Sequence, residues 1–365
     1  MGYIIPSPQP PTGEQFLMRE PATLSRLVSP GAAAMNNHWH GLRLAIEQAG
    51  AEVVADTSRS TFLVAGRHSM YPRDPGLMLQ VGNQRFYVTP DAPGAPAPRE
   101  AKEIATLLKR KGLATHVTAP GQFDGGDIVQ DAANNLLFVG VSNHHFMKKI
   151  VPSMHEWLTA LAAQQGTEVP EHFDPRDHVD AEQLQNYHRE VVRHAQPKRQ
   201  WLEHVRDRWS PEPLLAREGQ GLRIVPLFIP DTHSTEFYHL DGVFNVLPTG
   251  EAVVCEEALG KAARHLIHKY IGEDRILPIT IDEARRGATN FITVGDHIIT
   301  PYASPKMQEW FRGLGYQVTD PKTMHLPEGA WNFGHGAGPR CATLKLTPDK
   351  GHPPALPRPG LDMQR

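Results

Sequence analysis

The chain contains two cysteines, Cys255 and Cys341, and the residues around them differ. Cys341 follows residues 334–338, where three glycines let the backbone approach a bound molecule closely, because glycine has no side chain. Cys255 ends an apolar run, residues 252–255, that contains no glycine and is typical of a protein core. A thiolate is a strong nucleophile. We therefore predict that Cys341 is a nucleophile and that Cys255 is a core residue.

A general acid or base would have to accompany such a nucleophile. The chain has 20 histidines, so a single histidine carries little information. Only His239 combines a predicted strand with a carboxylate two residues on, Asp241, and such a spacing in a strand puts both side chains on one face. Histidine titrates near neutral pH, which suits proton transfer in both directions. We predict His239 as the acid/base residue; His335, near Cys341, is a second candidate or simply a loop residue.

One pattern recurs along the chain and could position these residues. An amphipathic helix ends at a glycine, which can take the left-handed conformation of a helix C-cap, and an apolar strand follows. After the third helix, the polar residues 167–220 come before the strand at residues 222–229, and we interpret them as a helical surface insertion that could act as a lid. The predicted helices are residues 36–49, 99–111, 154–165, 257–271 and 305–314.

Each unit of this pattern leads to a segment with reactive side chains. Equivalent positions of repeated units are equivalent in space, so a ring of five units would bring these segments to one axis. Alternatively, the pattern recurs by chance, as it can in any α/β chain of this length. The five segments are residues 71–76, 123–127, 238–241, 287–290 and 334–341.

These motifs resemble the guanidino-group-modifying pentein superfamily, which includes arginine deiminases, agmatine deiminases, dimethylarginine dimethylaminohydrolases and glycine amidinotransferases. The matched motifs are Arg73-Asp74, residues 124–127, residues 239–241 and the glycine-rich approach to Cys341, in the order of the family. Residues 123–128 are similar to the dimethylarginine hydrolases, whereas residues 336–341 are more similar to the deiminases. The resemblance implies an α/β fold, a five-bladed pseudo-symmetric propeller of ββαβ modules called a pentein ring.

The resemblance also implies roles for individual residues. Cys341 would attack the guanidinium carbon, His239 would transfer protons, and Asp124 would orient His239. Paired carboxylates match the forked N–H groups of a guanidinium ion, and Asp74 and Asp241 occupy the clamp positions. Asp74 and Asp124 also fit turns, because Asp74 stands in the turn sequence Arg-Asp-Pro-Gly and Asp124 precedes two glycines.

Three further residues are candidates for binding the substrate. Asn290, with Thr289, either binds substrate or forms a turn. The arginine that would bind a substrate carboxylate is not identified, and Arg285 and Arg286 are alternatives to the two in our predicted set. That set of substrate-binding residues is Asp74, Asp241, Arg73, Asn290 and Arg340.

The implied reaction is covalent and leaves a thiouronium adduct on Cys341. Water would discharge this adduct in a hydrolase, whereas an acceptor amine would discharge it in an amidinotransferase. We favour the hydrolase, because residues 336–341 resemble the deiminases. A non-catalytic ring that only binds a ligand is a remote third alternative. The expected substrate is a small guanidino compound, and neither a metal nor an organic cofactor is expected.

Composition restricts the remaining possibilities. The 365 residues carry a formal net charge of -3, so no basic surface indicates a nucleic-acid partner. No apolar run approaches the ~18 residues of a membrane span, and two cysteines are too few for a disulfide framework. We expect a cytoplasmic protein with one catalytic domain, residues 1–365, and a proline-rich tail from residue 348. The sequence does not determine its oligomeric state, and a homo-oligomer is one possibility.

Overall fold

The computed structural model describes residues 12–19, 30–56, 72–81, 84–91, 98–120, 123–142, 223–229, 237, 239–327, 329–332 and 337–347. Four of our predictions lie outside these residues: the helix at residues 154–165, the insertion at residues 167–220, His335 and the tail from residue 348.

The described strands form five three-stranded sheets that share one pattern. In each sheet the first strand in the spatial order pairs antiparallel with the second, and the second pairs parallel with the third. The sheets are β15 (Leu344–Lys345), β1 (Gln15–Arg19) and β2 (Glu52–Asp56); β3 (Leu77–Val81), β4 (Gln84–Asp91) and β5 (Thr115–Pro120); β6 (Ile128–Asp131), β7 (Leu136–Ser142) and β8 (Arg223–Ile229); β9 (Phe244–Val246), β10 (Ala252–Val254) and β11 (Ile276–Pro278); β12 (Ile292–Val294), β13 (His297–Ile299) and β14 (Gln317–Thr319).

A helix connects the two parallel strands in four of the sheets, as parallel neighbours require. These helices are α2 (Pro30–Gln48), α3 (Pro98–Arg110), α10 (Lys261–Ile271) and α12 (Pro305–Gly313), and the short α11 (Ile281–Arg285) precedes β12. The predicted C-cap glycines Gly50, Gly112, Gly272 and Gly315 have φ values of 90°, 65°, 92° and 88°. The positive φ predicted for a glycine at these four helix ends is therefore confirmed, although at Gly272 the ψ of 138° is extended rather than left-handed helical.

Two predicted boundaries are wrong. The first helix begins at Pro30, ahead of residue 36, and the fourth begins at Lys261 after a separate 3-10 turn, Glu256–Ala258. Gly260, the N-cap residue of the fourth helix, marks this break, and our prediction ran the helix through it.

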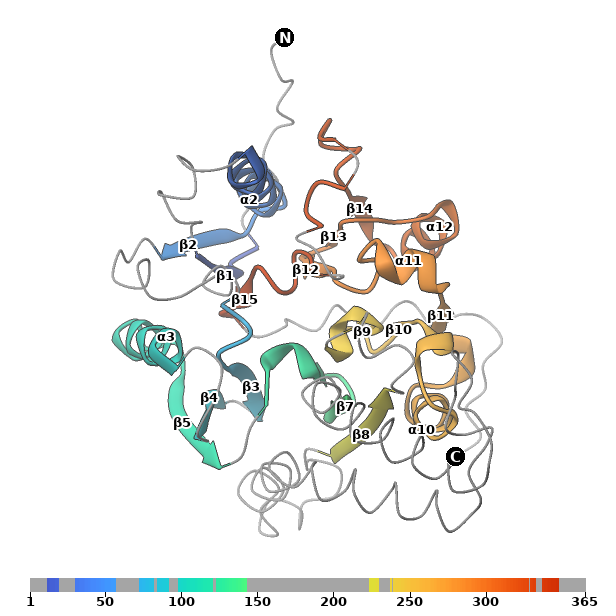
Figure 1. Ribbon diagram of the computed structural model, residues 1–365, viewed down its shortest axis with the longest axis horizontal. Helices are drawn as coiled ribbons and strands as arrows, with labels where there is room; N and C mark the ends of the chain where they lie inside the picture. Colours follow the sequence, from blue (N-terminus) through green and yellow to red (C-terminus); the bar gives the residue numbers. More distant parts are fainter. Residues whose placement is uncertain are drawn as a thin grey trace, which may run out of the picture.

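The sheets follow one another around the middle of the molecule in chain order, with α3, α10 and α12 toward the outside (Figure 1). The sheet of β15, β1 and β2 combines strands from both ends of the described chain, because Phe16 pairs with Lys345 and Leu17 with Leu344. The largest apolar cluster lies between the sheets of β6–β8, β9–β11 and β12–β14. The α/β fold class is confirmed.

The first strand of each sheet positions one reactive segment. These strands are β3, β6, β9, β12 and β15. Asp74 precedes β3, Asp127 precedes β6, Asp241 precedes β9, Asn290 precedes β12 and Cys341 precedes β15, each by one to three residues. The predicted segments therefore all lie at the N-terminal ends of equivalent strands.

Among the described residues, no helix has the length and apolar character needed to cross a membrane.

Candidate active site

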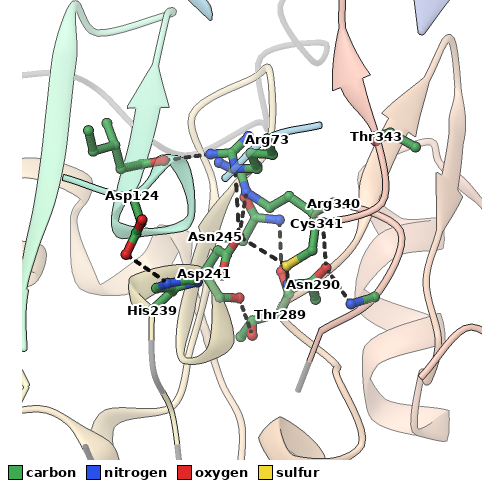
Figure 2. A network of polar contacts seen from close by, with 12 residues as sticks. Arg73, Asp124, His239, Asp241, Asn245, Thr289, Asn290, Arg340, Cys341 and Thr343 are labelled. Atoms are coloured by element: carbon green, nitrogen blue, oxygen red, sulfur yellow. Dashed lines mark hydrogen bonds and ion pairs between the residues drawn. The ribbon is translucent and has the colours of Figure 1, made fainter. Parts of the chain in front are cut away.

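Cys341 is held in a tight turn by Asn290. The side-chain oxygen of Asn290 accepts hydrogen bonds from the backbone N–H groups of Gly338 (2.9 Å) and Cys341 (3.1 Å). Its Nδ2 group donates to Cys341 Sγ at 3.1 Å. A side chain at Gly338 would begin 2.7 Å from Pro301 Cγ, so this close turn requires glycine. One amide thus fixes both the backbone and the sulfur of the predicted nucleophile (Figure 2).

Asp241 is the carboxylate in contact with the sulfur. Its Oδ2 atom lies 3.6 Å from Cys341 Sγ, 3.6 Å from Arg73 Nε and 3.8 Å from Arg340 Nε. The Thr289 hydroxyl donates to the backbone oxygen of Asp241 at 2.9 Å, and Asp241 is only 2% exposed. The two arginines compensate the charge of this buried carboxylate, which would otherwise be costly to desolvate.

His239 pairs with Asp124 on another part of the site. His239 Nε2 lies 3.4 Å from Asp124 Oδ2. Burial by itself lowers the pKa of His239, but the hydrogen bond and charge of Asp124, with the charges of Asp127 and Asp74, outweigh it and raise this pKa to about 10. The imidazole is therefore a cation at neutral pH, ready to give up a proton.

The prediction that His239 and Asp241 share one face of a strand is wrong. Residues Leu240–Gly242 form a 3-10 turn, and His239 stands just before it. The turn directs His239 to Asp124 and Asp241 to the sulfur and the arginines, so the two side chains have different contacts. A second 3-10 turn, Gly125–Asp127, packs against it.

Asp74 connects the two parts of the site electrostatically. Burial raises the pKa of Asp74 to about 7; the His239 cation opposes this shift, and the charges of Asp124 and Asp241 add to it. Its Oδ1 atom is buried and has no hydrogen-bond partner among the described residues. An acceptor of this kind is costly unless a ligand supplies the donor.

The thiol of Cys341 resists ionisation in this state. Burial raises its pKa well above the ordinary value, and the charges of Asp241 and Asp74 raise it further, against the opposing hydrogen bonds from Asn290 and Gly338. A cation between the two carboxylates would remove most of the electrostatic part of this shift.

The structure thus brings together all eight predicted site residues, and three of them have contacts that we did not predict. Arg73 and Arg340 were candidates for a substrate carboxylate, and the structure places both on Asp241. Asn290 was a candidate for binding substrate or for a turn; its backbone N–H closes a turn on the Gly287 oxygen at 2.9 Å, and its side chain contacts Cys341. Cys255 is fully buried in the largest apolar cluster, which confirms it as a core residue.

Asn245 is a site residue that sequence reasoning missed. Its buried Nδ2 group donates to the backbone oxygens of Thr289 (2.8 Å) and Phe291 (3.0 Å), and so holds the segment that carries Asn290. A signal was present, since an asparagine inside the apolar run of residues 243–247 must find buried partners. The sequence does not show what those partners are.

No group of three or more histidine, cysteine or acidic side chains among the described residues is arranged to hold a metal ion.

Comparisons with known proteins agree with this geometry at the level of fold. No family model and no curated protein matches the sequence. The structure is similar to ArgZ, an arginine dihydrolase from the ornithine–ammonia cycle in cyanobacteria (17% identity, TM-score 0.55), and to AgrE (16% identity, TM-score 0.57). It is also similar to a dimethylarginine dimethylaminohydrolase (16% identity, TM-score 0.53).

The coverage of these matches is unequal. The match covers 92% of this chain in each of the ArgZ and dimethylaminohydrolase comparisons and 93% in that with AgrE. It spans only 40% of the full ArgZ and AgrE chains, but 98% of the N-terminal domain of ArgZ and 100% of the dimethylaminohydrolase. At this identity the likeness establishes the fold. The chain thus shares the fold of the guanidino-modifying enzymes of the pentein superfamily, the superfamily that its sequence motifs resemble.

Proposed function

We propose that the chain is a cysteine hydrolase that acts on the guanidino group of arginine or an arginine derivative, through a covalent thiouronium intermediate on Cys341. One observation carries this proposal: Cys341 Sγ lies 3.6 Å from Asp241, in a buried cluster that also holds Asp74 and the His239–Asp124 pair. The same set of groups provides a nucleophile, two carboxylates for a cation and a proton donor. The five sheets, in this proposal, close into a five-bladed propeller around the site.

The substrate would bind as a planar cation between Asp74 and Asp241. The buried Oδ1 atom of Asp74 accepts a guanidinium N–H, which supplies the donor that it lacks among the described residues. The raised pKa of Asp74, about 7, favours the same partner, because a nearby cation stabilises the ionised carboxylate.

Binding of this cation would also activate the nucleophile. The charges of Asp241 and Asp74 are what raise the pKa of the Cys341 thiol beyond the effect of burial, and the guanidinium offsets both. The hydrogen bond from Asn290 Nδ2 then stabilises the thiolate. The thiol would thus ionise when the correct substrate is present and stay protonated otherwise.

The first half-reaction forms a bond between sulfur and the guanidinium carbon. The thiolate lone pair makes this bond, and a tetrahedral intermediate results. His239, a cation at neutral pH because its pKa is raised to about 10, gives its proton to the leaving nitrogen. The C–N bond breaks, ammonia or an alkylamine leaves, and a thiouronium cation remains on Cys341.

The second half-reaction returns the enzyme to its starting state. Neutral His239 takes a proton from water as the water oxygen attacks the thiouronium carbon. The C–S bond then breaks as the remaining hydroxyl proton leaves the intermediate, the electron pair and a proton return to sulfur to restore the Cys341 thiol, and a ureido product leaves. Asp124 stabilises the cationic form of His239 at each proton transfer, the third-group role in a catalytic triad.

Intact-protein mass spectrometry tests this proposal. The protein is mixed with arginine, a methylated arginine, agmatine or guanidinoacetate and quenched with acid, while ureido product and ammonia are assayed in parallel. We expect an amidino-derived adduct on the wild type and ureido product in water alone. An adduct that only an added amine discharges would instead indicate an amidinotransferase.

Two variants make the test specific. Cys341→Ser should abolish both adduct and product, whereas Cys255→Ala, at the buried core cysteine, should retain both. If no substrate of the panel gives an adduct or a product with the wild type, the proposed hydrolase activity is wrong for this substrate class.

A further inference from the structure

A cavity lies along the first strands of the sheets, beyond the reactive residues at their N-terminal ends. It has a volume of about 130 Å³, well above the ~10–15 Å³ that one water molecule needs. Its lining comes mainly from the five first strands and the residues next to them, one to seven positions beyond the reactive residues. These lining segments are residues 77–80, residues 130 and 132, residues 245–248, residues 291–293, and residues 343–345 with 347. Cys341, His239, Asp74 and Asp124 are not among the lining residues.

The lining of this cavity is cationic. Among the described residues, it contains four basic side chains, Arg73, Arg85, Arg340 and Lys345, and no carboxylate. Two carboxylates outside the lining contact three of these cations: Asp241 lies next to Arg73 and Arg340, and Glu14 accepts from Lys345 Nζ at 2.7 Å. Like charges that converge on a partly enclosed space attract an anion, because low-dielectric walls strengthen the field within it.

The other polar groups of the lining do not oppose an anion. The Gln130 side chain bonds to the Gln80 backbone of the neighbouring sheet, where its Nε2 group donates to the Gln80 oxygen at 2.7 Å and its Oε1 atom accepts from the Gln80 N–H at 3.2 Å. The Thr343 hydroxyl donates to the Pro339 oxygen at 2.8 Å. These groups are neutral, so the charged side chains set the preference of the cavity.

We propose that this cavity binds a small oxyanion of the phosphate type. The planar guanidinium groups of arginine offer two parallel N–H groups that match a pair of oxyanion oxygens, and the Lys345 ammonium adds a compact charge. The cavity volume accommodates one such anion with part of its hydration. This site is separate from the proposed catalytic function, because none of the groups assigned to nucleophilic attack or proton transfer lines it.

The anion site and the active site meet at two shared side chains. Arg73 and Arg340 line the cavity and also contact Asp241, and Figure 2 shows both above Asp241, with His239 below it. An anion bound to these arginines would therefore be linked through them to the carboxylate that touches Cys341.

Isothermal titration calorimetry with inorganic phosphate, at constant ionic strength, tests the proposal without any enzymatic readout. We expect saturable binding at one site of the wild-type protein. Arg85→Gln and Lys345→Gln each remove one lining cation and should weaken binding about tenfold or more, since a charge-assisted hydrogen bond is lost. Circular dichroism checks that both variants are folded.

Two controls locate the bound anion. Arg264→Gln removes an equal charge from an exposed position of α10 and should bind phosphate like the wild type. Cys341→Ser should also bind it unchanged, which separates this cavity from the catalytic groups. Phenyl phosphate in place of phosphate tells whether an organic phosphate fits as well. No saturable binding to the wild type, or equal weakening by Arg85→Gln and Arg264→Gln, would overturn the proposal.

Discussion

Asn290 makes the contacts that keep Cys341 in position. Its oxygen accepts two backbone hydrogen bonds from the cysteine turn, and its nitrogen donates to the sulfur. The sequence left Asn290 between substrate binding and a turn; its backbone N–H does close a turn on the Gly287 oxygen at 2.9 Å, and its side chain in addition positions Cys341. Because the nitrogen is a donor, the contact favours the thiolate over the thiol.

We predict that Asn290→Asp slows the reaction of Cys341 with iodoacetamide at pH 8 by about tenfold or more, since a donor to sulfur is lost and a negative charge is added. Peptide mass spectrometry distinguishes Cys341 from the buried Cys255. Asn332→Asp, which adds the same charge at a partly exposed position, should alkylate like the wild type. Equal rates for wild type and Asn290→Asp would refute the positioning role.

Asp74 should lower the stability of the folded protein at high pH. Its pKa rises from 3.8 to about 7 on folding, so the folded protein binds this proton more tightly than the unfolded chain. The resulting stabilisation is complete below about pH 4 and is lost as the pH rises through about 7. A buried carboxylate that is costly when ionised is expected at a cation-binding site.

Replacement of Asp74 by Asn should therefore raise the free energy of unfolding at pH 8 relative to the wild type, on the order of 1 kcal/mol or more, and abolish turnover. Urea unfolding at pH 4 and pH 8 measures the difference, which should be smaller at pH 4. Asp282→Asn, at a side chain that is 85% exposed, should show no such dependence on pH. A variant less stable than the wild type at pH 8 would contradict this assignment.

At the scale of elements, two 3-10 turns pack together and set the His239–Asp124 pair. Gly125–Asp127 and Leu240–Gly242 each precede a first strand, β6 and β9. A side chain at Gly125 would begin 1.9 Å from the Arg73 backbone oxygen, and one at Gly126 would begin 2.4 Å from His239 Nδ1. The paired glycines therefore allow the turns to approach each other closely, which explains the Asp-Gly-Gly-Asp motif.

Gly126→Ala should displace His239 from Asp124 and lower kcat by about tenfold or more, because a misplaced acid/base residue loses much of its effect. The alkylation rate of Cys341 should change less than kcat. Gly313→Ala is the matched control, since a side chain there meets nothing within 4 Å. Steady-state kinetics on both variants measures kcat. A kcat for Gly126→Ala equal to that of Gly313→Ala would exclude this role of Gly126.

At the scale of the whole molecule, the sheet of β15, β1 and β2 joins the two ends of the described chain. Leu17 of β1 pairs with Leu344 of β15, and both are buried in one apolar cluster with residues of α3. Cys341 stands three residues before β15, so the register of this sheet positions the nucleophile. The stability of the sheet and the geometry of the active site are thus connected.

Leu17→Ala should lower the free energy of unfolding by about 2–5 kcal/mol, because it removes a fully buried side chain and leaves a cavity. Urea unfolding measures the loss. Leu44→Ala, at a position of α2 that is 40% exposed, should stay within about 0.5 kcal/mol of the wild type. Similar losses for the two variants would show that β1 is not part of the cooperative core.

Much of the fold could be predicted from local patterns. The helix–glycine–strand units were recognisable because a positive φ at a helix end selects glycine, as at Gly50, Gly112, Gly272 and Gly315. The short first strands, such as β9, β12 and β15, were not, since two or three residues carry no periodicity. Their pairing is set by packing against neighbouring strands.

By itself, the sequence determined which reactive residue types are present and in what order, and it distinguished Cys341 from the core residue Cys255. Only the tertiary structure decided their partners. The contact of Cys341 with Asp241 joins residues 100 positions apart, and that with Asn290 joins residues 51 apart. Local propensity cannot specify such contacts, because they arise when separate sheets pack and bring the ends of their first strands together.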